Sequence, residues 1–538
     1  MRALVIDALA RASGKRYATF DVVGVGPRLV AGLLIQLGIK TDLKTYEHVM
    51  ENEEMIDNYD IVLISAMSSD REAVSKLAGK LSRYNVVKIL GGPIGLEFYE
   101  LLASMDIDLV IIGEAENQLI RLFTEFKKDV ISKDFNALSE VKGLAYKAGN
   151  KIVFTGFSKY VSKDLLNKIK PYTLVDKSYE FYWARRFYVE VVRGCSNFRR
   201  PLLDLGFGRK CIKCLRCSSP KLHERLWCPR LIMPGCGFCS VPFLFGPPRS
   251  RNVHAIVNEV RELIRHGARR IVLSAPDFLD YARETLVPNE LLTDPCYPRP
   301  NYHAIEYLLK KLHEIPEVYS GEVKIFIENI KACLVDEKIA EILGQYIKGT
   351  TIHIGLETAS DKYNETVIGK PITLEHVVRA VELLTKYGLR PYVYLIYGLP
   401  YMDAKVYRKT IKTIPLLYEK GVEKITLYKF SPLPLTSFEF FKPQVSKYTS
   451  LIKKLKNVII KHNLEAKKKL LGKTVKVYVV KVNHKLYGYP EEHGPVVFVK
   501  NDNRLPKDAK GALCKIVVTD IRPRYVYGNI LEIIEVFK

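Results

Sequence analysis

Seven of the ten cysteines in this 538-residue chain fall between Cys195 and Cys239, and this crowding limits what the chain can fold into. Core packing does not explain it, whereas a metal site gathers cysteines. Three of the seven are Cys195, Cys236 and Cys239. Three thiolates leave one iron of a 4Fe-4S cluster without a protein ligand, and that open corner can chelate a substrate. Free cysteines, or a zinc site with other ligands, are the alternatives.

The other four cysteines form a second set in the same segment. Cys211, Cys214 and Cys217 are each separated by two residues, and Cys228 follows before a proline. Four ligands make a closed site, so we expect either an auxiliary 4Fe-4S cluster or a tetrahedral structural zinc. A disulfide framework would require secretion, but the chain starts without the apolar core of a signal peptide. We therefore expect a cytoplasmic protein.

The sequence around Cys195, Cys236 and Cys239 resembles the radical S-adenosylmethionine (SAM) superfamily. Residues 189–195 read as a strand that ends in the first ligand, and Phe238 is the aromatic residue expected before the last one, Cys239. About forty residues separate Cys195 from Cys236, where the superfamily usually has three, so we interpret residues 198–234 as an insertion. The resemblance implies that the three cysteines hold a 4Fe-4S cluster. Electrons from a ferredoxin or flavodoxin would then cleave SAM into methionine and a 5′-deoxyadenosyl radical.

Residues 181–440 alternate between helical and strand patterns. Strands are predicted at 270–274, 324–328, 351–355 and 391–397, with helices at 253–266 and 336–343. This alternation predicts a partial (β/α)6 barrel. By the resemblance, Glu357 would hold a polar group of SAM, and the backbone at Phe238 and Gly398 would contact its adenine. Lys370 and Arg379 are candidates for binding the SAM carboxylate. No side chain is identifiable as a base that acts on a substrate.

The first 145 residues carry short apolar runs at 2–7, 61–65, 86–90 and 109–112 with a helix at 27–37, which predicts a Rossmann-like parallel sheet. Ligands bind such sheets at the carboxyl ends of the strands. This region resembles the cobalamin-binding domain of many radical SAM enzymes, although its histidine loop is absent. The implied cobalamin-binding residues are Ser65, Ser69, Gly91, Gly92, Gly113 and Glu114. A Rossmann-like domain that has lost its cofactor, or that only docks a partner, is the alternative.

A linker is expected at 146–180 and a basic helical connector at 441–470. Residues 471–538 then show strand patterns at 472–480, 495–499 and 514–519, which predict a small antiparallel β-barrel. The pattern resembles the TRAM domain, an RNA-binding module of tRNA-modifying enzymes, and the net charge of +24 favours a polyanionic partner. The implied RNA-binding residues are Lys473, Lys476, Tyr478, Arg522, Arg524 and Tyr525. A β-barrel with solvated lysines is the alternative, and we expect His484 and His493 to be loop residues.

Together these resemblances imply an enzyme that methylates a carbon of a hypermodified tRNA nucleoside, with the methyl group supplied by cobalamin. Methylthiotransferases share the domain order but place three cysteines in the N-terminal domain, and this chain has none before Cys195. Methylthiolation of a tRNA adenosine derivative is the second hypothesis. A non-catalytic RNA-binding protein stabilised by metal is the third. The most apolar window, 22–39, is interrupted by Pro27 and Arg28, so no membrane span is expected.

Overall fold

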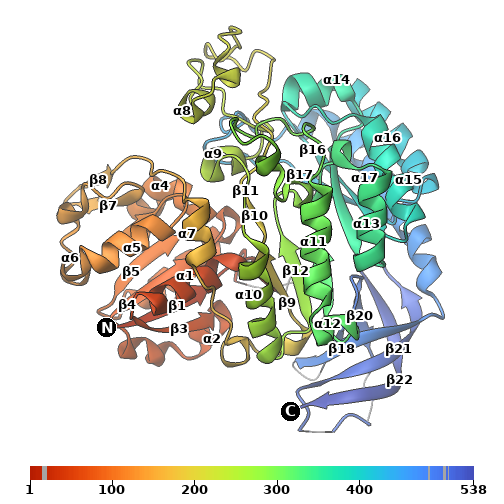
Figure 1. The fold of residues 1–538 in the computed structure, drawn as a ribbon, viewed down its shortest axis with the longest axis horizontal. Coiled ribbons are helices and arrows are strands. Elements are labelled where there is room, and N and C mark those ends of the chain that lie inside the picture. Colours follow the sequence, from red (N-terminus) through yellow and green to blue (C-terminus); the bar gives the residue numbers. More distant parts are fainter. Residues whose placement is uncertain (15–20, 483–484, 501–503, 507) are drawn as a thin grey trace. The chain divides into compact units, whose positions relative to one another are not determined.

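The computed structural model describes residues 1–14, 21–482, 485–500, 504–506 and 508–538 (Figure 1). The chain divides into two compact units. The first contains Met1–Val189 and Arg251–Ala268, and the second contains Glu190–Ser250 and Arg269–Lys538. Helix α10 (Val253–Arg265) therefore belongs to the first unit, although the sequence pattern placed it in the barrel.

The first unit is built on a seven-stranded sheet. Its order is β3 (Lys40–Thr45), β1 (Arg2–Asp7), β4 (Ile61–Ser65), β5 (Val87–Gly91), β6 (Leu109–Ile111), β7 (Leu144–Ala148) and β8 (Lys151–Phe154). The five strands from β3 to β6 are parallel, as predicted, whereas β7 and β8 extend the sheet in antiparallel fashion. All five residues of β4 are buried, as expected for a parallel strand covered on both faces.

Helices cover both faces of this sheet. On one face α1 (Val25–Gln36) packs against β1, β3 and β4 and contacts α5 (Glu116–Thr124), and Figure 1 shows the two side by side. On the other face, α2 (Tyr46–Glu51), α3 (Arg71–Leu81) and α4 (Phe98–Ser104) contribute Val49, Leu77 and Leu101 to a core that includes Leu4 and Ile6. This is the doubly wound arrangement, so the carboxyl ends of the strands form one edge.

The second unit contains parallel strands that alternate with helices, which confirms the predicted partial barrel. The strands are β12 (Arg270–Ser274), β13 (Lys324–Ile327), β14 (Asn329–Ile330), β15 (Thr351–Glu357), β16 (Arg390–Tyr397) and β17 (Lys424–Lys429). The intervening helices are α11 (Tyr302–His313), α13 (Glu337–Ile347), α15 (Leu374–Lys386) and α16 (Ala404–Glu419). Along β16, residues alternate between buried and half-buried, so Tyr392, Tyr394 and Ile396 share one face.

Two short strands that pair with each other flank the cysteine-rich segment. β10 (Val192–Arg193) pairs antiparallel with β11 (Arg249–Ser250), so Val192 lies opposite Ser250. The chain between them is mostly irregular, with α8 (Leu222–Leu226) inside the insertion and α9 (Val241–Phe245) after it. The pairing returns the chain to its starting point, which brings Cys195 near the later cysteines.

The chain ends in helix α17 (Thr449–Lys467) and a closed five-stranded barrel. Its order is β18 (Thr474–Val482), β19 (Lys485–Pro490), β20 (Val496–Val499), β22 (Tyr525–Phe537) and β21 (Gly511–Ile521). The predicted all-antiparallel barrel is wrong at one pairing, because β20 and β22 run parallel. Val477, Val497 and Ile516 lie in its core. Across the described residues, no helix combines the length and the apolar character that crossing a bilayer requires.

Candidate functional site

Cys195, Cys236 and Cys239 line one cavity of about 310 Å³ in the second unit. The Cys195 amide donates to the Gly246 carbonyl (3.0 Å), and the Cys239 amide donates to the Cys236 carbonyl (2.8 Å). The structure thus brings together three thiols that the insertion separates in sequence. Within the described ranges, no group of His, Cys, Asp or Glu side chains is placed to hold a single metal ion. Three thiols on one cavity are the ligand set of a four-iron cluster that keeps one iron open, so the chemistry of these residues fits this cofactor.

Asn197 connects two of these thiols. Its side-chain amide donates to Cys236 Sγ (3.3 Å) and to the Gly369 carbonyl (3.1 Å), while its backbone amide donates to Cys195 Sγ (3.4 Å). Hydrogen bonds to sulfur favour the thiolate form that binds metal. Burial acts in the opposite direction, since it raises the pKa of Cys236 to about 11 and that of Cys239 to about 12. Metal binding at this site must therefore release protons.

Glu357 and Lys370 form a buried ion pair on the same cavity. Lys370 Nζ donates to Glu357 Oε1 and to the Gly355 carbonyl, both at 2.7 Å. Burial alone would lower the pKa of Lys370, but the charges of Glu357 and Cys236 hold it above its ordinary value. A Cβ atom at Gly355 would lie 2.6 Å from Glu357 Oε1, so a larger residue there would force the ion pair to shift. Glu357 itself has a positive φ of 64°, a strained conformation of the kind found at functional sites.

The other residues predicted to contact SAM are placed differently. Phe238 lines the cavity with the thiols. Gly398 is not on the cavity wall; its amide donates to the Tyr407 hydroxyl (3.0 Å), and its carbonyl accepts from the Gln444 amide (2.9 Å). Both backbone groups of Gly398 form hydrogen bonds within the protein, and its contact with adenine stays a prediction. Arg379 is exposed on α15, whereas Lys370 lies in the cavity.

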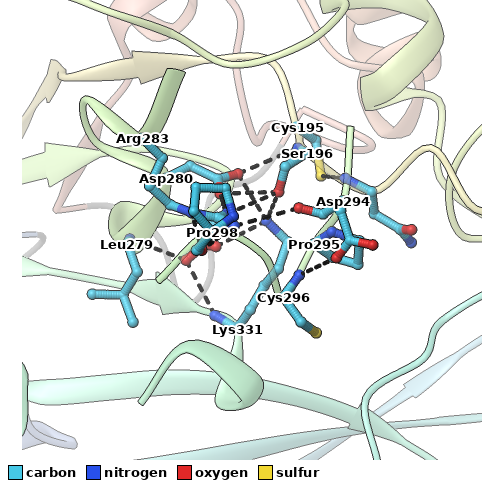
Figure 2. Close-up of polar contacts among 12 residues, drawn as sticks. Cys195, Ser196, Leu279, Asp280, Arg283, Asp294, Pro295, Cys296, Pro298 and Lys331 are labelled. Atoms are coloured by element: carbon cyan, nitrogen blue, oxygen red, sulfur yellow. Dashed lines mark hydrogen bonds and ion pairs between the residues drawn. The ribbon is translucent and has the colours of Figure 1, made fainter. Parts of the chain in front are cut away.

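A buried charge cluster that sequence patterns did not reveal borders the first thiol (Figure 2). Lys331 Nζ donates to Asp277 and Asp280 (both 2.8 Å) and to the Ser196 hydroxyl (2.9 Å). Arg283 forms a second ion pair with Asp280, and the charges of Lys331 and Arg283 outweigh burial and hold the pKa of Asp280 below its usual range. Two cations and two carboxylates make the cluster neutral. It therefore fixes the segment beside Cys195 without adding net charge to the cavity.

The second cysteine set surrounds a separate cavity of about 490 Å³, lined by Cys211, Cys214, Cys217 and Cys228. Arg200 is almost fully buried and donates to Cys217 Sγ (2.8 Å). Backbone amides donate to two more sulfurs, from Lys213 to Cys211 (3.5 Å) and from Arg230 to Cys228 (3.4 Å). Donors of this kind accompany metal-bound thiolates, but the four sulfurs are not placed to hold a single metal ion among the described residues, so a metal site here stays a prediction.

Three cysteines lie outside the segment from Cys195 to Cys239 and belong to neither set of thiols. Cys514 is buried in the core of the C-terminal barrel. Cys296 and Cys333 form a disulfide, which the sequence analysis did not predict. The two residues are 37 positions apart, and no spacing signature marks such a pair.

In the first unit, the predicted cobalamin residues lie at the carboxyl edge of the sheet. Ser65 ends β4, Gly91 ends β5, and Gly92 and Gly113 both have positive φ angles in the loops that follow strands. Glu114 is buried, and its carboxylate accepts from the Val161 amide (2.6 Å), so this side chain already has a structural partner. Ser69 is exposed in the loop after β4.

At the same edge, the loop after β1 is held by two buried carboxylates. Asp70 accepts from the backbone amides of Ala10, Arg11 and Ala12 at 2.8 to 3.0 Å. Asp7 accepts from the Tyr179 hydroxyl (3.2 Å) and lies 3.5 Å from the Arg11 guanidinium. Residues 8–14 take their shape from these contacts, and they follow Asp7 without the histidine that the resemblance would place there.

The C-terminal barrel exposes most of the residues predicted to bind RNA. Lys473, Lys476, Arg522 and Arg524 are exposed, and Tyr525 is half-buried. The prediction for Tyr478 is wrong, because its side chain is 0% exposed and packs against Phe537, so its ring cannot stack on a base. His493 is a loop residue as expected, yet it is buried, and His484 lies outside the described residues.

Sequence reasoning missed the aromatic neighbours of Tyr525. Phe498 contacts Tyr487, Tyr525 and Tyr527 with ring centroids 4.4 to 5.9 Å apart. The four rings are half-buried, and the Arg522 guanidinium lies over Tyr527 (5.9 Å). Tyr487 lies on β19, Phe498 on β20, and Tyr525 and Tyr527 on β22, so the rings meet only because these strands pair. The sequence does not show that pairing.

Two relatives match nearly the whole chain. The uncharacterized protein MJ1620 of Methanocaldococcus jannaschii is 39% identical over 99% of both chains. The uncharacterized protein MK0932 of Methanopyrus kandleri is 36% identical over 99% of this chain and 96% of its own. More distantly, the putative methylthiotransferase MJ0865 of M. jannaschii is 24% identical over 64% of this chain and 61% of its own. The tRNA-2-methylthio-N(6)-dimethylallyladenosine synthase of Pelagibacter ubique is 23% identical over 44% and 54%.

Among solved structures, the radical S-adenosylmethionine methyltransferase TsrM from Kitasatospora setae matches with a TM-score of 0.58. The match covers 82% of this chain and 77% of TsrM at 12% identity, and that structure contains cobalamin and a [4Fe-4S] cluster. The match shows that the two chains share a fold. The model of the radical SAM superfamily matches residues 227–414, which include Cys228, Cys236, Cys239 and Glu357. The chain belongs to the radical SAM superfamily, in one family with MJ1620 and MK0932, and is a radical SAM enzyme that uses a 4Fe-4S cluster and SAM.

Proposed function

We propose that this enzyme methylates a carbon atom of a tRNA nucleoside in the cytoplasm, with cobalamin as a second cofactor. The observation that carries the proposal is the cavity that three thiols share with the Glu357–Lys370 pair. Relatives of this chain include methylthiotransferases, and the fold is that of a methyltransferase. Both comparisons support transfer of a one-carbon group.

In this proposal Cys195, Cys236 and Cys239 hold the cluster, and Asn197 orients two of them through its hydrogen bonds. When bound, the cluster and SAM supply the 5′-deoxyadenosyl radical that takes hydrogen from the substrate carbon. Lys370 is placed to bind the carboxylate of SAM, and Glu357 a polar group on it, since both line the cavity. Their mutual ion pair keeps each side chain oriented before SAM arrives.

Cobalamin would be held at the carboxyl edge of the first unit's sheet by Ser65, Ser69, Gly91, Gly92, Gly113 and Glu114. When bound, it supplies the methyl group. The sharp turns at Gly92 and Gly113 bring backbone to this edge without side chains, which suits a large planar ligand. The lack of cysteine before Cys195 favours methylation over methylthiolation, because no second cluster with an open iron is provided there.

The four insertion cysteines would hold a second 4Fe-4S cluster or a zinc ion. The buried Arg200 and two backbone amides that donate to these sulfurs support a thiolate site but fit either metal. An electron donor such as a ferredoxin or flavodoxin would reduce the SAM-binding cluster. Iron and zinc analysis of the Cys211→Ala and Cys214→Ala variants against the parent chain separates the two metals.

Binding of tRNA is assigned to the exposed face of the C-terminal barrel. Tyr487, Phe498, Tyr525 and Tyr527 offer ring surfaces, and Arg522 and Arg524 offer positive charge, which is the combination that binds single-stranded RNA. Tyr478 is removed from the RNA-binding set. Lys473 and Lys476 remain in it as exposed cations.

The decisive experiment uses anaerobically reconstituted protein with SAM and dithionite. The parent chain should produce 5′-deoxyadenosine, and Cys195→Ala should not, whereas Cys514→Ala, which removes a core thiol, should retain activity. Absence of 5′-deoxyadenosine from the parent chain would reject the proposed reaction. Cobalamin absorbance in the purified protein and a tRNA nucleoside heavier by one methylene would favour methylation, and a nucleoside heavier by a methylthio group would favour the second candidate, methylthiolation.

A further inference from the structure

The cavity that carries the three thiols has a second wall made of rings. His353 on β15, Tyr394 on β16 and Tyr428 on β17 line it, on neighbouring strands of the partial barrel. The Tyr394 ring contacts His353 at 5.2 Å and Tyr428 at 5.5 Å between centroids. Tyr428 is 51% exposed, so this wall runs from the interior of the barrel to its surface.

We propose that this wall is the substrate compartment and that it takes an uncharged planar heteroaromatic ring, such as a nucleobase. The inference rests on the proposed function, which it deepens by assigning the part of the substrate that enters the cavity. A ligand at this wall would mainly contact aromatic rings. Stacking on aromatic rings does not require a particular base.

The charges around the cavity explain why the ring should be uncharged. Lys370 is paired with Glu357, and Lys331 is paired with Asp277 and Asp280. Each cation on the wall therefore has its carboxylate partner within 2.8 Å. The part of the wall formed by Tyr394 and Tyr428, unlike the Glu357–Lys370 pair assigned to SAM, carries no charge that could meet a charged ring, and removing that charge from water would be unfavourable.

Hydrogen bonds fix the orientation of this wall. The Tyr394 hydroxyl and His353 Nδ1 share a hydrogen bond of 2.9 Å, and His353 Nε2 lies 3.4 Å from Thr351 Oγ1. Thr351 in turn bonds His493, whose ring stacks on Phe326 at 4.4 Å between centroids. His493 belongs to the loop between β19 and β20. The series of contacts from Tyr394 through His353 and Thr351 therefore ends at a residue of the C-terminal barrel. His493 is thus a positioning residue for the compartment.

The test measures binding and needs no turnover. Full-length, cluster-loaded protein is titrated into 2-aminopurine riboside, a fluorescent purine nucleoside, with saturating S-adenosylhomocysteine present so that the SAM portion of the cavity is filled. The parent chain should quench the fluorescence saturably, adenosine should compete and ribose should not. Tyr428→Ala should weaken binding about tenfold through loss of one stacking surface.

Tyr307→Ala is the matched control, because Tyr307 is 53% exposed on α11 and away from the cavity wall. Equal affinities for the Tyr428→Ala and Tyr307→Ala variants, or no saturable quenching by the parent chain, would overturn the assignment. Protein that binds the probe at Tyr428 but makes no 5′-deoxyadenosine would keep this inference and reject the proposed reaction. The two failures are therefore distinguishable.

The positioning role of His493 has its own readout. His493→Ala should weaken binding of the probe several-fold, about as much as Tyr394→Phe, which removes only the hydroxyl. His493→Gln, which retains a hydrogen-bond partner for Thr351, should recover most of the affinity, and His303→Ala, at an exposed position, should change nothing. Similar affinity in His493→Ala and the parent chain would exclude the role. Thermal unfolding of each variant separates a local effect from loss of the C-terminal barrel.

Discussion

The Asn197 side chain reaches across the insertion to Cys236 Sγ, while its backbone amide donates to Cys195 Sγ. Asn197→Asp keeps its size but cannot donate to Cys236 Sγ, and it adds a negative charge beside the sulfurs. We expect lower iron and sulfide content and a more negative reduction potential, by about 60 mV, which is a tenfold change for a one-electron couple. Redox titration and iron analysis measure both.

The control for this substitution is Asn258→Asp, at an exposed position of α10. It introduces the same charge in the unit that contains no cysteine, so its cluster content and potential should match the parent chain. A parent-like potential in Asn197→Asp would mean that the hydrogen bond to Cys236 does not influence the site.

At the scale of single residues, sequence patterns pointed to Cys195 and Glu357 because both stand at or just after strand ends, and to Phe238 because it directly precedes Cys239. Lys331 could not be found in this way. Its partners Asp277 and Ser196 are 54 and 135 positions away, so only the folded barrel joins them. Tyr478 was predicted to bind RNA as an aromatic residue among the basic residues of the barrel, but its side chain packs against Phe537 and lies near Arg269 and Arg270.

At the scale of elements, two glycine turns lie at the carboxyl edge of the first unit's sheet, where cobalamin is proposed to bind. Substitutions there test how much each turn depends on glycine. Gly92 and Gly113 both have left-handed φ angles, 93° and 85°. A Cβ atom at Gly92 would lie 2.5 Å from the Ala66 carbonyl oxygen, whereas one at Gly113 would meet nothing within 4 Å. Gly113→Ala should therefore cost about 1 kcal/mol of stability from the backbone alone.

Gly92→Ala should cost about 2 to 4 kcal/mol, since overpacking adds to the same backbone strain. Denaturant unfolding of the two variants measures the difference, which isolates the steric contact with Ala66. Equal losses of stability would show that the loop moves away from the added methyl group without resistance.

The connector helix α17 ends in a lysine that is sensitive to pH. Lys467 Nζ donates to the carbonyls of Arg522 (2.7 Å) and Pro523 (2.9 Å). Burial, with a smaller contribution from the charge of Lys424, lowers the pKa of Lys467 from 10.5 to about 8. Between these values the unfolded chain binds a proton that the folded chain does not, so this lysine makes folding more favourable as pH rises from about 8 to 10.5.

Lys467→Met removes that titration. Relative to the parent chain, the variant should lose about 1 to 2 kcal/mol of the stability gained between pH 8 and 10.5, a range that allows for partial exposure of the side chain. Lys461→Met, at an exposed position of the same helix, is the control. Parallel curves of unfolding free energy against pH for Lys467→Met and the parent chain would contradict the prediction.

Strands could be predicted from the sequence where a continuous run of apolar residues marked them. The buried runs β1, β4 and β12 lie where the apolar patterns placed them, because a parallel strand buried on both faces is apolar throughout. The hairpin of β7 and β8 was missed, since Lys147 and Lys151 interrupt its pattern. The 13-residue β22 was also missed, because Glu532 and Glu535 interrupt its apolar pattern and one of its two partners, β20, is not adjacent to it in sequence.

For the molecule as a whole, the net charge of +24 is the property most relevant to a tRNA partner. Charge alone predicts binding that weakens with salt but does not locate it. On the C-terminal barrel, two contributions to tRNA binding come from different residues. Arg522 and Arg524 carry charge, and Tyr525 offers a ring surface. The two kinds of residue should affect the salt dependence differently.

Arg522→Ala and Arg524→Ala should each reduce the slope of log affinity against log salt by about 1, because each removes one phosphate contact. Tyr525→Ala should weaken tRNA binding by about 1 to 3 kcal/mol without changing the slope, because stacking displaces no counterions. Tyr478→Phe should bind like the parent chain, since that side chain is fully buried. Fluorescence anisotropy with labelled tRNA over a series of KCl concentrations measures all four. A parent-like slope in both arginine variants, with undiminished affinity in Tyr525→Ala, would mean that tRNA meets this protein on another surface.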